Sequence, residues 1–161
     1  MRRALISGAG IAGATAAYWL AEAGFEVTVV EQAVGVRSSG SPVDVRGAAV
    51  EVADRMGVMT RIRAAETCVR DMVFVNGRGR EVSRVNMRTT WAEPADVELA
   101  RGDLAAILRD AVPDQVEVQF GNSVTALEQD ADGVTAEFDR GPTRRFELAS
   151  AQTVPTPGFV R

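Results

Sequence analysis

Short apolar runs and a longer alanine-rich stretch follow one another at the start of the chain. Ala4–Ile6 is a short apolar run, an alanine-rich stretch then continues to Gly24, and a second apolar run covers Val27–Val30. Short apolar runs bounded by glycine are typical of buried strands, whereas the stretch between them is long enough for a helix. The pattern therefore predicts a β-α-β unit in the first thirty or so residues.

Helical and strand-like patterns alternate again farther along, which predicts an α/β fold. Glycine, proline and asparagine mark the ends of most segments. The first predicted elements are a brief strand at Val43–Val45, a helix within Gly47–Met59 ending near Gly57, and helical turns at Arg61–Thr67. A hairpin follows from Asp71, with Asn76-Gly77 as its turn and a second strand at Val82–Arg88, and then a loop at Thr89–Asp96. The last predicted elements are a helix with Asp103 as N-cap that Pro113 ends, a strand at Val116–Phe120, a hairpin of Val124–Glu128 and Val134–Phe138, and one more strand starting at Arg144–Leu148.

A glycine-rich turn with the spacing G-x-G-x-x-G joins the first strand to the helix, at Gly8, Gly10 and Gly13. In this motif the first glycine permits a tight turn, the second lets the backbone approach a pyrophosphate, and the third lets the helix pack closely on the sheet. Glu31 ends the second strand, near the position about 20 residues on where an acid binds a ribose hydroxyl. Together these features predict a dinucleotide-binding site, which by itself suits FAD and NAD equally.

Two other interpretations of this stretch stay open. Met1-Arg2-Arg3 before an apolar segment also occurs in secretory signals, although Glu22 and three glycines interrupt the apolar stretch here. The second alternative is a glycine-rich turn that binds nothing.

The composition narrows the chemistry. The 161 residues have a net charge of −4 and are 46% hydrophobic, which suits one domain, or one domain with part of another, and disfavours nucleic acid as a partner. The chain has no histidine, so Ser-His-Asp and Cys-His nucleophiles and histidine metal sites are ruled out. We predict no metal site and no catalytic side chain, and any chemistry has to come from a cofactor or from carboxylates. The single Cys68 allows no internal disulfide and predicts a cytoplasmic protein, and no apolar run approaches the roughly 20 residues that span a bilayer.

Several motifs follow one another in a characteristic order: Gly8-x-Gly10-x-x-Gly13, Glu31-Gln32, Arg37, Pro42-Val-Asp44-Val-Arg46-Gly47 and Glu98-Leu-Ala-Arg101-Gly-Asp-Leu104. In this order the chain resembles the FAD-dependent aromatic hydroxylases, that is, flavoprotein monooxygenases of the p-hydroxybenzoate hydroxylase type, which include tetracycline-modifying members. The resemblance runs from Met1 to about Leu148. It implies a Rossmann-like FAD-binding domain (GR2 class) with a β-hairpin insertion and the start of a substrate-domain sheet.

The resemblance also implies a role for each matching residue. Plain alternatives stay open for three of them: Arg37 as a solvated loop charge, Asp44 as a helix cap, and Arg101 as a surface partner of Asp103 or Glu98. At the FAD pyrophosphate the implied cofactor-binding residues are Gly8, Gly10 and Gly13 with the neighbouring Ile11 and Ala12, and at the adenosine ribose they are Glu31 with the neighbouring Gln32. Arg37 would lie near the cofactor phosphate and ribose or an incoming nicotinamide cofactor, and Asp44 on the flavin side. Arg101 would reach FAD from its helix, and the backbone of Val124 would lie beside the adenine.

FAD is the cofactor that the resemblance implies, with NADPH as a transient co-substrate, O2 as oxidant and an aromatic or polyketide-like substrate. Glu31 disfavours a 2′-phosphate at its own site because the charges repel. The corresponding domain organisation is a FAD-binding βαβ portion at 1–70, substrate-domain strands at 71–100, a return to the FAD-binding domain at 101–148, and an aberrant tail at 149–161.

The segment Ala149–Arg161 departs from the family pattern, which continues with a Gly-Ala-Asp-Gly segment and more than as much chain again. Pro155 and Pro157 suit a central strand poorly. If GC-rich codons are assigned to this segment, its nucleotide sequence read from two bases later encodes Leu-Gly-Ala-Asp-Gly-Ala-His-Ser-Gly-Val-Arg. GC-rich codons fit the absence of lysine among the 18 basic residues of the chain. We therefore hypothesise a C-terminally truncated, aggregation-prone monooxygenase whose reading frame was lost near Ala149, which the nucleotide sequence would check.

Three functional hypotheses follow. The first is an FAD-binding oxidoreductase of the monooxygenase kind, with little or no activity as this fragment alone. The second is a non-catalytic FAD- or NAD-binding module or partner subunit. The third is a fragment of an NAD-dependent dehydrogenase, which the placement of Arg37, Asp44 and Arg101 disfavours.

Overall fold

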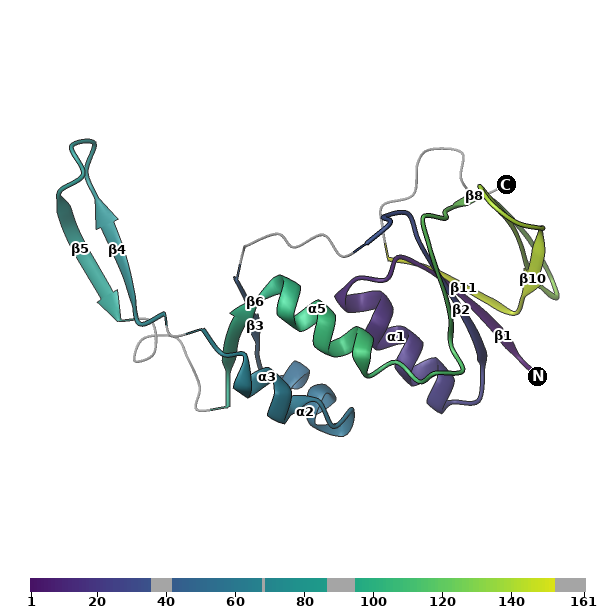
Figure 1. Ribbon diagram of the computed structural model, residues 1–161, viewed down its shortest axis with the longest axis horizontal. Coiled ribbons are helices and arrows are strands. Elements are labelled where there is room, and N and C mark those ends of the chain that lie inside the picture. The colour runs from purple at the N-terminus through teal and green to yellow at the C-terminus, as the bar shows by residue number, and fades with distance from the viewer. Residues whose placement is uncertain (36–41, 68, 87–94, 153–161) are drawn as a thin grey trace. The chain divides into compact units, whose positions relative to one another are not determined.

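The computed structural model describes residues 1–35, 42–67, 69–86 and 95–152, which fall into a first unit within 1–39 and 104–161 and a second unit within 40–103. The first unit contains β1 (Arg3–Ser7), α1 (Ile11–Glu22), β2 (Glu26–Glu31), most of α5 (Arg101–Asp110), β7 (Glu117–Phe120), β8 (Val124–Asp130), β9 (Gly133–Phe138), β10 (Arg144–Phe146) and β11 (Leu148–Ala151) (Figure 1). The second contains β3 (Pro42–Val45), α2 (Ala48–Arg55), α3 (Met59–Ala64), β4 (Asp71–Val75), β5 (Glu81–Asn86) and β6 (Val97–Ala100).

A parallel sheet with the strand order β11-β1-β2-β7 forms the centre of the first unit. Its four strands are paired in parallel, and α1 makes the crossover from β1 to β2, as the apolar pattern predicts. The chain leaves β1 towards β2 on one side and returns to β11 on the other, so the order reverses at β1. In sheets of this kind ligands bind outside the carboxyl ends of the strands at such a reversal, which is where the glycine-rich turn lies.

The two faces of this sheet pack against different layers, because successive strand residues point to opposite sides. On one face Ala4, Ile6, Val27 and Val29 form a buried cluster with Ala17 of α1. On the other face Leu5 and Val30 pack against Val124, Ala136 and Phe146 of the three-stranded antiparallel sheet β10-β9-β8. The result is a helix–sheet–sheet sandwich with α1 and the small sheet on opposite faces.

The strand predicted to start at Arg144–Leu148 is in fact two strands. Residues up to Phe146 pair antiparallel with β9, whereas Leu148–Ala151 pair in parallel with β1. Between them Glu147 changes layer: its N–H donates to the Arg3 carbonyl, and its carboxylate accepts from the Arg3 N–H. The prediction that the fold ends before Ala149 is therefore wrong for Ala149–Ala151, which belong to the central sheet, and the rest of the predicted tail from 153 lies outside the described residues.

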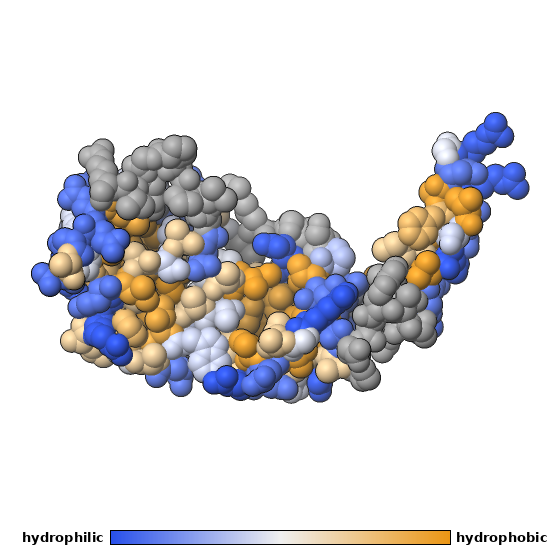
Figure 2. Space-filling model, turned by 180° about the vertical axis from the view of Figure 1, so that it is seen from behind, coloured by the Kyte–Doolittle hydropathy of each residue, from blue (hydrophilic) through white to orange (hydrophobic). Residues whose placement is uncertain are grey.

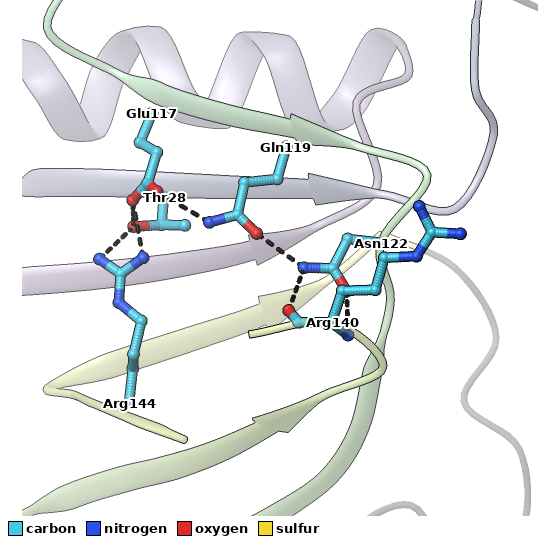
Figure 3. Close-up of polar contacts among 6 residues, drawn as sticks. All are labelled: Thr28, Glu117, Gln119, Asn122, Arg140 and Arg144. Carbon is cyan, nitrogen blue, oxygen red and sulfur yellow. Dashed lines mark hydrogen bonds and ion pairs between the residues drawn. The ribbon is translucent and has the colours of Figure 1, made fainter. Parts of the chain in front are cut away.

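Polar side chains tie the small sheet to the edge of the central one (Figure 3). Arg144 Nη1 of β10 lies 2.7 Å from Glu117 Oε2 of β7, and Arg144 Nη2 donates to the Thr28 hydroxyl at 3.2 Å. Thr28 is buried in β2, and its hydroxyl in turn donates to Glu117 Oε2. The hydrogen bond from Arg144 is the main reason that the pKa of Glu117 lies below its ordinary value of 4.5.

Glu117→Gln is expected to lower the free energy of unfolding at neutral pH by about 0.2–1 kcal/mol, the usual range for a partly exposed ion pair. Because the folded-state pKa of Glu117 is lowered, its contribution is complete above the unfolded-state pKa and disappears as the pH falls through the folded-state value. Urea unfolding of both proteins from pH 7 to pH 3 measures this. The difference between them should vanish at the acid end, and the exposed control Glu128→Gln should leave the free energy of unfolding at pH 7 nearly unchanged.

In the second unit the short strands β3 and β6 pair antiparallel, and Leu99 of β6 is fully buried. The Thr67 N–H and hydroxyl bind the Glu98 carbonyl and carboxylate, so the end of α3 is fixed beside β6. The helix predicted to begin with Asp103 as N-cap starts earlier, at Arg101, which makes Asp103 a residue of its first turn. An acid in the first turn still favours the helix through the macrodipole.

The predicted hairpin is present as β4 and β5, with a different turn. Asn76 closes it by accepting from the N–H groups of Arg78 and Arg80 with its side chain, and Gly79 has φ +75. The turn is thus longer than the two-residue Asn76-Gly77 turn expected, and Gly79 rather than Gly77 takes the left-handed conformation.

The hairpin exposes apolar side chains on both strands: Met72, Val73, Phe74, Val75 and Val82 are 38–67% exposed. Met72 lies opposite Val85 and Phe74 opposite Ser83 on one face, while Arg84 binds Asp71 and Glu81 on the other. Orange hydrophobic surface marks the hairpin in Figure 2. Two strands alone do not bury such a face, so this surface favours self-association in water.

Phe74→Ser is expected to raise the solubility of the chain, because Phe74 is half exposed and contributes more to association than to folding. Light scattering over a concentration series measures the effect. Phe120→Ser is the matched control, because Phe120 is a similarly exposed aromatic residue on the edge strand β7. An equal gain in solubility from both changes would show that the hairpin is not the main surface of self-association.

Candidate functional site

The glycine-rich turn brings α1 unusually close to β1. A Cβ added to Gly13 would lie 1.8 Å from the Gly8 carbonyl oxygen and 2.9 Å from the carbonyl carbon, both backbone atoms that cannot rotate away. Gly8 itself has φ +109, and its N–H donates to the Val30 carbonyl at 2.7 Å. Only glycine fits at either position, so the first and third motif glycines have the roles expected of them.

Gly10 differs from its two neighbours in the motif. It is the N-cap of α1 with ordinary extended dihedrals, no side chain caps the helix, and a Cβ added there would meet nothing within 4 Å. The protein therefore leaves open the space that a Cβ would enter, directly in front of the first N–H groups of α1 at Ile11 and Ala12. The first turn of α1 carries no acid and no side chain caps it, so no side chain of the helix itself competes with an anion here.

Glu31 closes the other side of this turn. Its Oε2 accepts from the Ala9 N–H at 2.8 Å, and its Oε1 accepts from the Ala33 N–H at 2.8 Å. The carboxylate thus joins the glycine-rich turn to the end of β2. A carboxylate has about four acceptor positions, so each oxygen keeps capacity for a hydroxyl donor such as ribose, and the residues present fit a dinucleotide.

The other predicted site residues fall into three groups. Gln32 is exposed beside Glu31, and the Val124 side chain is buried in the core, so its backbone is the part left for the predicted adenine contact. Asp44 and Arg101 are exposed and belong to the second unit, where Asp44 forms an exposed ion pair with Arg46 at 2.6 Å. Arg37 lies outside the described residues. The structure therefore brings the glycines and Glu31 together, and the roles of the remaining residues stay predictions.

Sequence reasoning missed the groups that hold the site in place. The Gly121-Asn122 pair is simply a break after a strand in the sequence, yet the Asn122 N–H donates to the Glu31 carbonyl and the Gly121 N–H to the Ala33 carbonyl, both at 3.2 Å. Asn122 is 5% exposed, and its amide binds Gln119 and the backbone of Arg140 (Figure 3). No periodic signal marks a single buried asparagine.

The family model for the FAD binding domain matches residues 2–152 of this chain. The chain therefore belongs to the FAD-binding domain family, which confirms the predicted fold class and FAD as the predicted cofactor. The match extends to residue 152, in agreement with the place of β11 in the central sheet.

Relatives and solved structures agree with this assignment. The chain is 38% identical to protein Rv1260 of Mycobacterium tuberculosis, over 92% of this chain and 41% of the relative. It is 33% identical to a flavin-dependent monooxygenase of Legionella longbeachae, over 91% of this chain and 38% of the relative. It is 32% identical to the tetracycline destructase Tet(51), with a TM-score of 0.81, over 94% of this chain and 38% of that one. The flavin-dependent monooxygenase PieE, solved with FAD and substrate, is 25% identical with a TM-score of 0.76, over 91% and 29%.

These similarities confirm the resemblance to flavoprotein monooxygenases. The chain spans about two fifths of the length of the curated relatives it matches. Within the described ranges, no helix has both the length and the apolar character needed to cross a membrane.

Replacing two of the glycines separates folding from binding. Gly13→Ala should destabilise the first unit and abolish nucleotide binding, because its Cβ would collide with the Gly8 backbone. Gly10→Ala should leave thermal unfolding nearly unchanged, because its Cβ meets no protein atom, yet weaken FAD binding by occupying the space for the pyrophosphate. Differential scanning calorimetry and FAD titration of both variants measure this. If Gly10→Ala binds FAD as well as the parent chain, the pyrophosphate does not lie there.

Proposed function

We propose that this chain forms the FAD-binding part of a flavoprotein monooxygenase that uses NADPH and O2. The observation that carries the proposal is the position of the Glu31 carboxylate against the glycine-rich turn, in a chain of the FAD-binding domain family. Similarity to flavin-dependent monooxygenases over more than 90% of the chain supports the same reaction class. When bound, FAD would supply the transfer of electrons from NADPH to O2 that hydroxylation requires.

The residues of the first unit would each hold one part of the nucleotide. The N–H groups at the start of α1 would face the pyrophosphate, because the helix dipole and the open space at Gly10 favour an anion there. Glu31 would accept from the adenosine ribose hydroxyls. Its charge opposes a 2′-phosphate at the same place, so the site favours FAD over direct binding of NADPH, which would bind elsewhere and transiently.

The proposed substrate is an aromatic or polyketide-like molecule. The support is the resemblance to the aromatic hydroxylases and the similarity to a tetracycline destructase. In this chain Asp44 and Arg101, and Arg37 outside the described residues, are the proposed contacts nearer the flavin and NADPH. We expect the 161-residue chain itself to bind FAD with little or no hydroxylation, since its relatives are more than twice as long. A cytoplasmic location is proposed from the single cysteine.

Titration with FAD tests the proposal directly. The purified chain should change flavin fluorescence on binding FAD, and FMN, which lacks the adenosine half, should bind more weakly. Glu31→Gln should weaken FAD binding roughly tenfold or more, because a charged acceptor is lost and an amide N–H would face backbone N–H groups. Glu22→Gln, an exposed acid at the end of α1, is the matched control. A folded chain with no fluorescence change on adding FAD would contradict the proposal.

A further inference from the structure

The connection between β9 and β10 carries an arginine whose backbone is held firmly. The Arg140 N–H donates to Asn122 Oδ1 at 3.0 Å, and the Arg140 carbonyl accepts from Asn122 Nδ2 at 2.9 Å. One buried amide thus fixes both backbone groups of a single residue. The preceding Asp139 N–H donates to the Ser123 carbonyl at 2.9 Å, so the start of this connection is fixed as well.

The same turn holds the end of β2. Gly121 and Asn122 donate their backbone N–H groups to the carbonyls of Ala33 and Glu31. The short turn after β7 therefore connects two segments that are far apart in the sequence. One carries the Glu31 carboxylate, and the other carries the Arg140 guanidinium.

The guanidinium lies beside the continuation of β2. A Cβ added to Gly121 would be 3.7 Å from Arg140 Nη1 and 3.7 Å from Val34 Cγ2, so the guanidinium and the Val34 side chain both lie close to Gly121. Figure 3 shows the Arg140 side chain running past Asn122 and away from the other side chains drawn. It is 75% exposed, and its ion pair with Asp139 is long, at 4.0 Å, and also exposed. Such a pair contributes little, so the faces and most donors of the guanidinium remain accessible.

We propose that Arg140 is a further nucleotide-binding residue whose guanidinium lies against the adenine ring. The inference rests on the proposed function. With the pyrophosphate at the start of α1 and the ribose at Glu31, the group that extends past the end of β2 is the adenine. A guanidinium is planar, stacks on aromatic faces and donates to ring nitrogens, which matches a purine better than a hydroxyl or an ammonium would.

Affinities of three probes, FAD, ADP and FMN, test this inference in the 161-residue chain. Arg140→Ala should weaken FAD and ADP by about two- to fivefold, the range for an exposed cation–π contact, and leave FMN unchanged because FMN has no adenine. Arg140→Lys should recover only part of the loss, since lysine keeps the charge but not the planar fork. Arg78→Ala removes the same charge from the hairpin turn and should change none of the three affinities.

Thermal unfolding of Arg140→Ala should match that of the parent chain, because the Asn122 contacts involve only the backbone of residue 140. If Arg140→Ala binds FAD and ADP each as tightly as the parent chain does, the inference is overturned while the proposed function stays intact. Equal losses in Arg140→Ala and Arg78→Ala would overturn it too, because they would indicate a general charge effect. A parent chain that binds neither FAD nor ADP would overturn both this inference and the proposed function.

Discussion

The contact on which the first unit depends is the approach of α1 to the end of β1, where Gly13 lies against the Gly8 carbonyl with no room for a side chain. This approach directs the first N–H groups of α1 to the carboxyl end of the parallel sheet. It also leaves Ala9 in reach of the Glu31 carboxylate. The open helix terminus proposed for the pyrophosphate and the carboxylate proposed for the ribose are therefore two results of one packing constraint, and neither arrangement can be kept if that constraint is relaxed.

A second set of contacts keeps the end of β2 in place. The central sheet is covered on one face by the small sheet β10-β9-β8, and the two are joined by an apolar cluster around Phe146 and by polar contacts at their edge. Asn122 stands where these layers meet and satisfies its amide completely with protein partners. Buried polar groups of this kind fix a single arrangement because leaving them unpaired is costly. The candidate nucleotide site thus depends on contacts with the small sheet, although the glycines and Glu31 lie outside that sheet.

The second unit has a different character. Its β4–β5 hairpin leaves apolar side chains open to solvent. An apolar face on a two-stranded sheet is typical of a face that packs against another layer. The observation fits the expectation of an aggregation-prone surface.

The sequence alone determined the β-α-β unit, the motif glycines and Glu31, because each depends on local rules: strand and helix periodicity, and backbone positions that only glycine can occupy. It could not separate β10 from β11, since both are short, only Glu147 lies between them, and only pairing with β9 or with β1 distinguishes them. It also could not find the hydrogen bonds between the Asn122 side chain and the backbone of Arg140, because these residues are neighbours only in space. Tertiary structure decided those features because they depend on which strand ends meet, and no local pattern encodes that meeting.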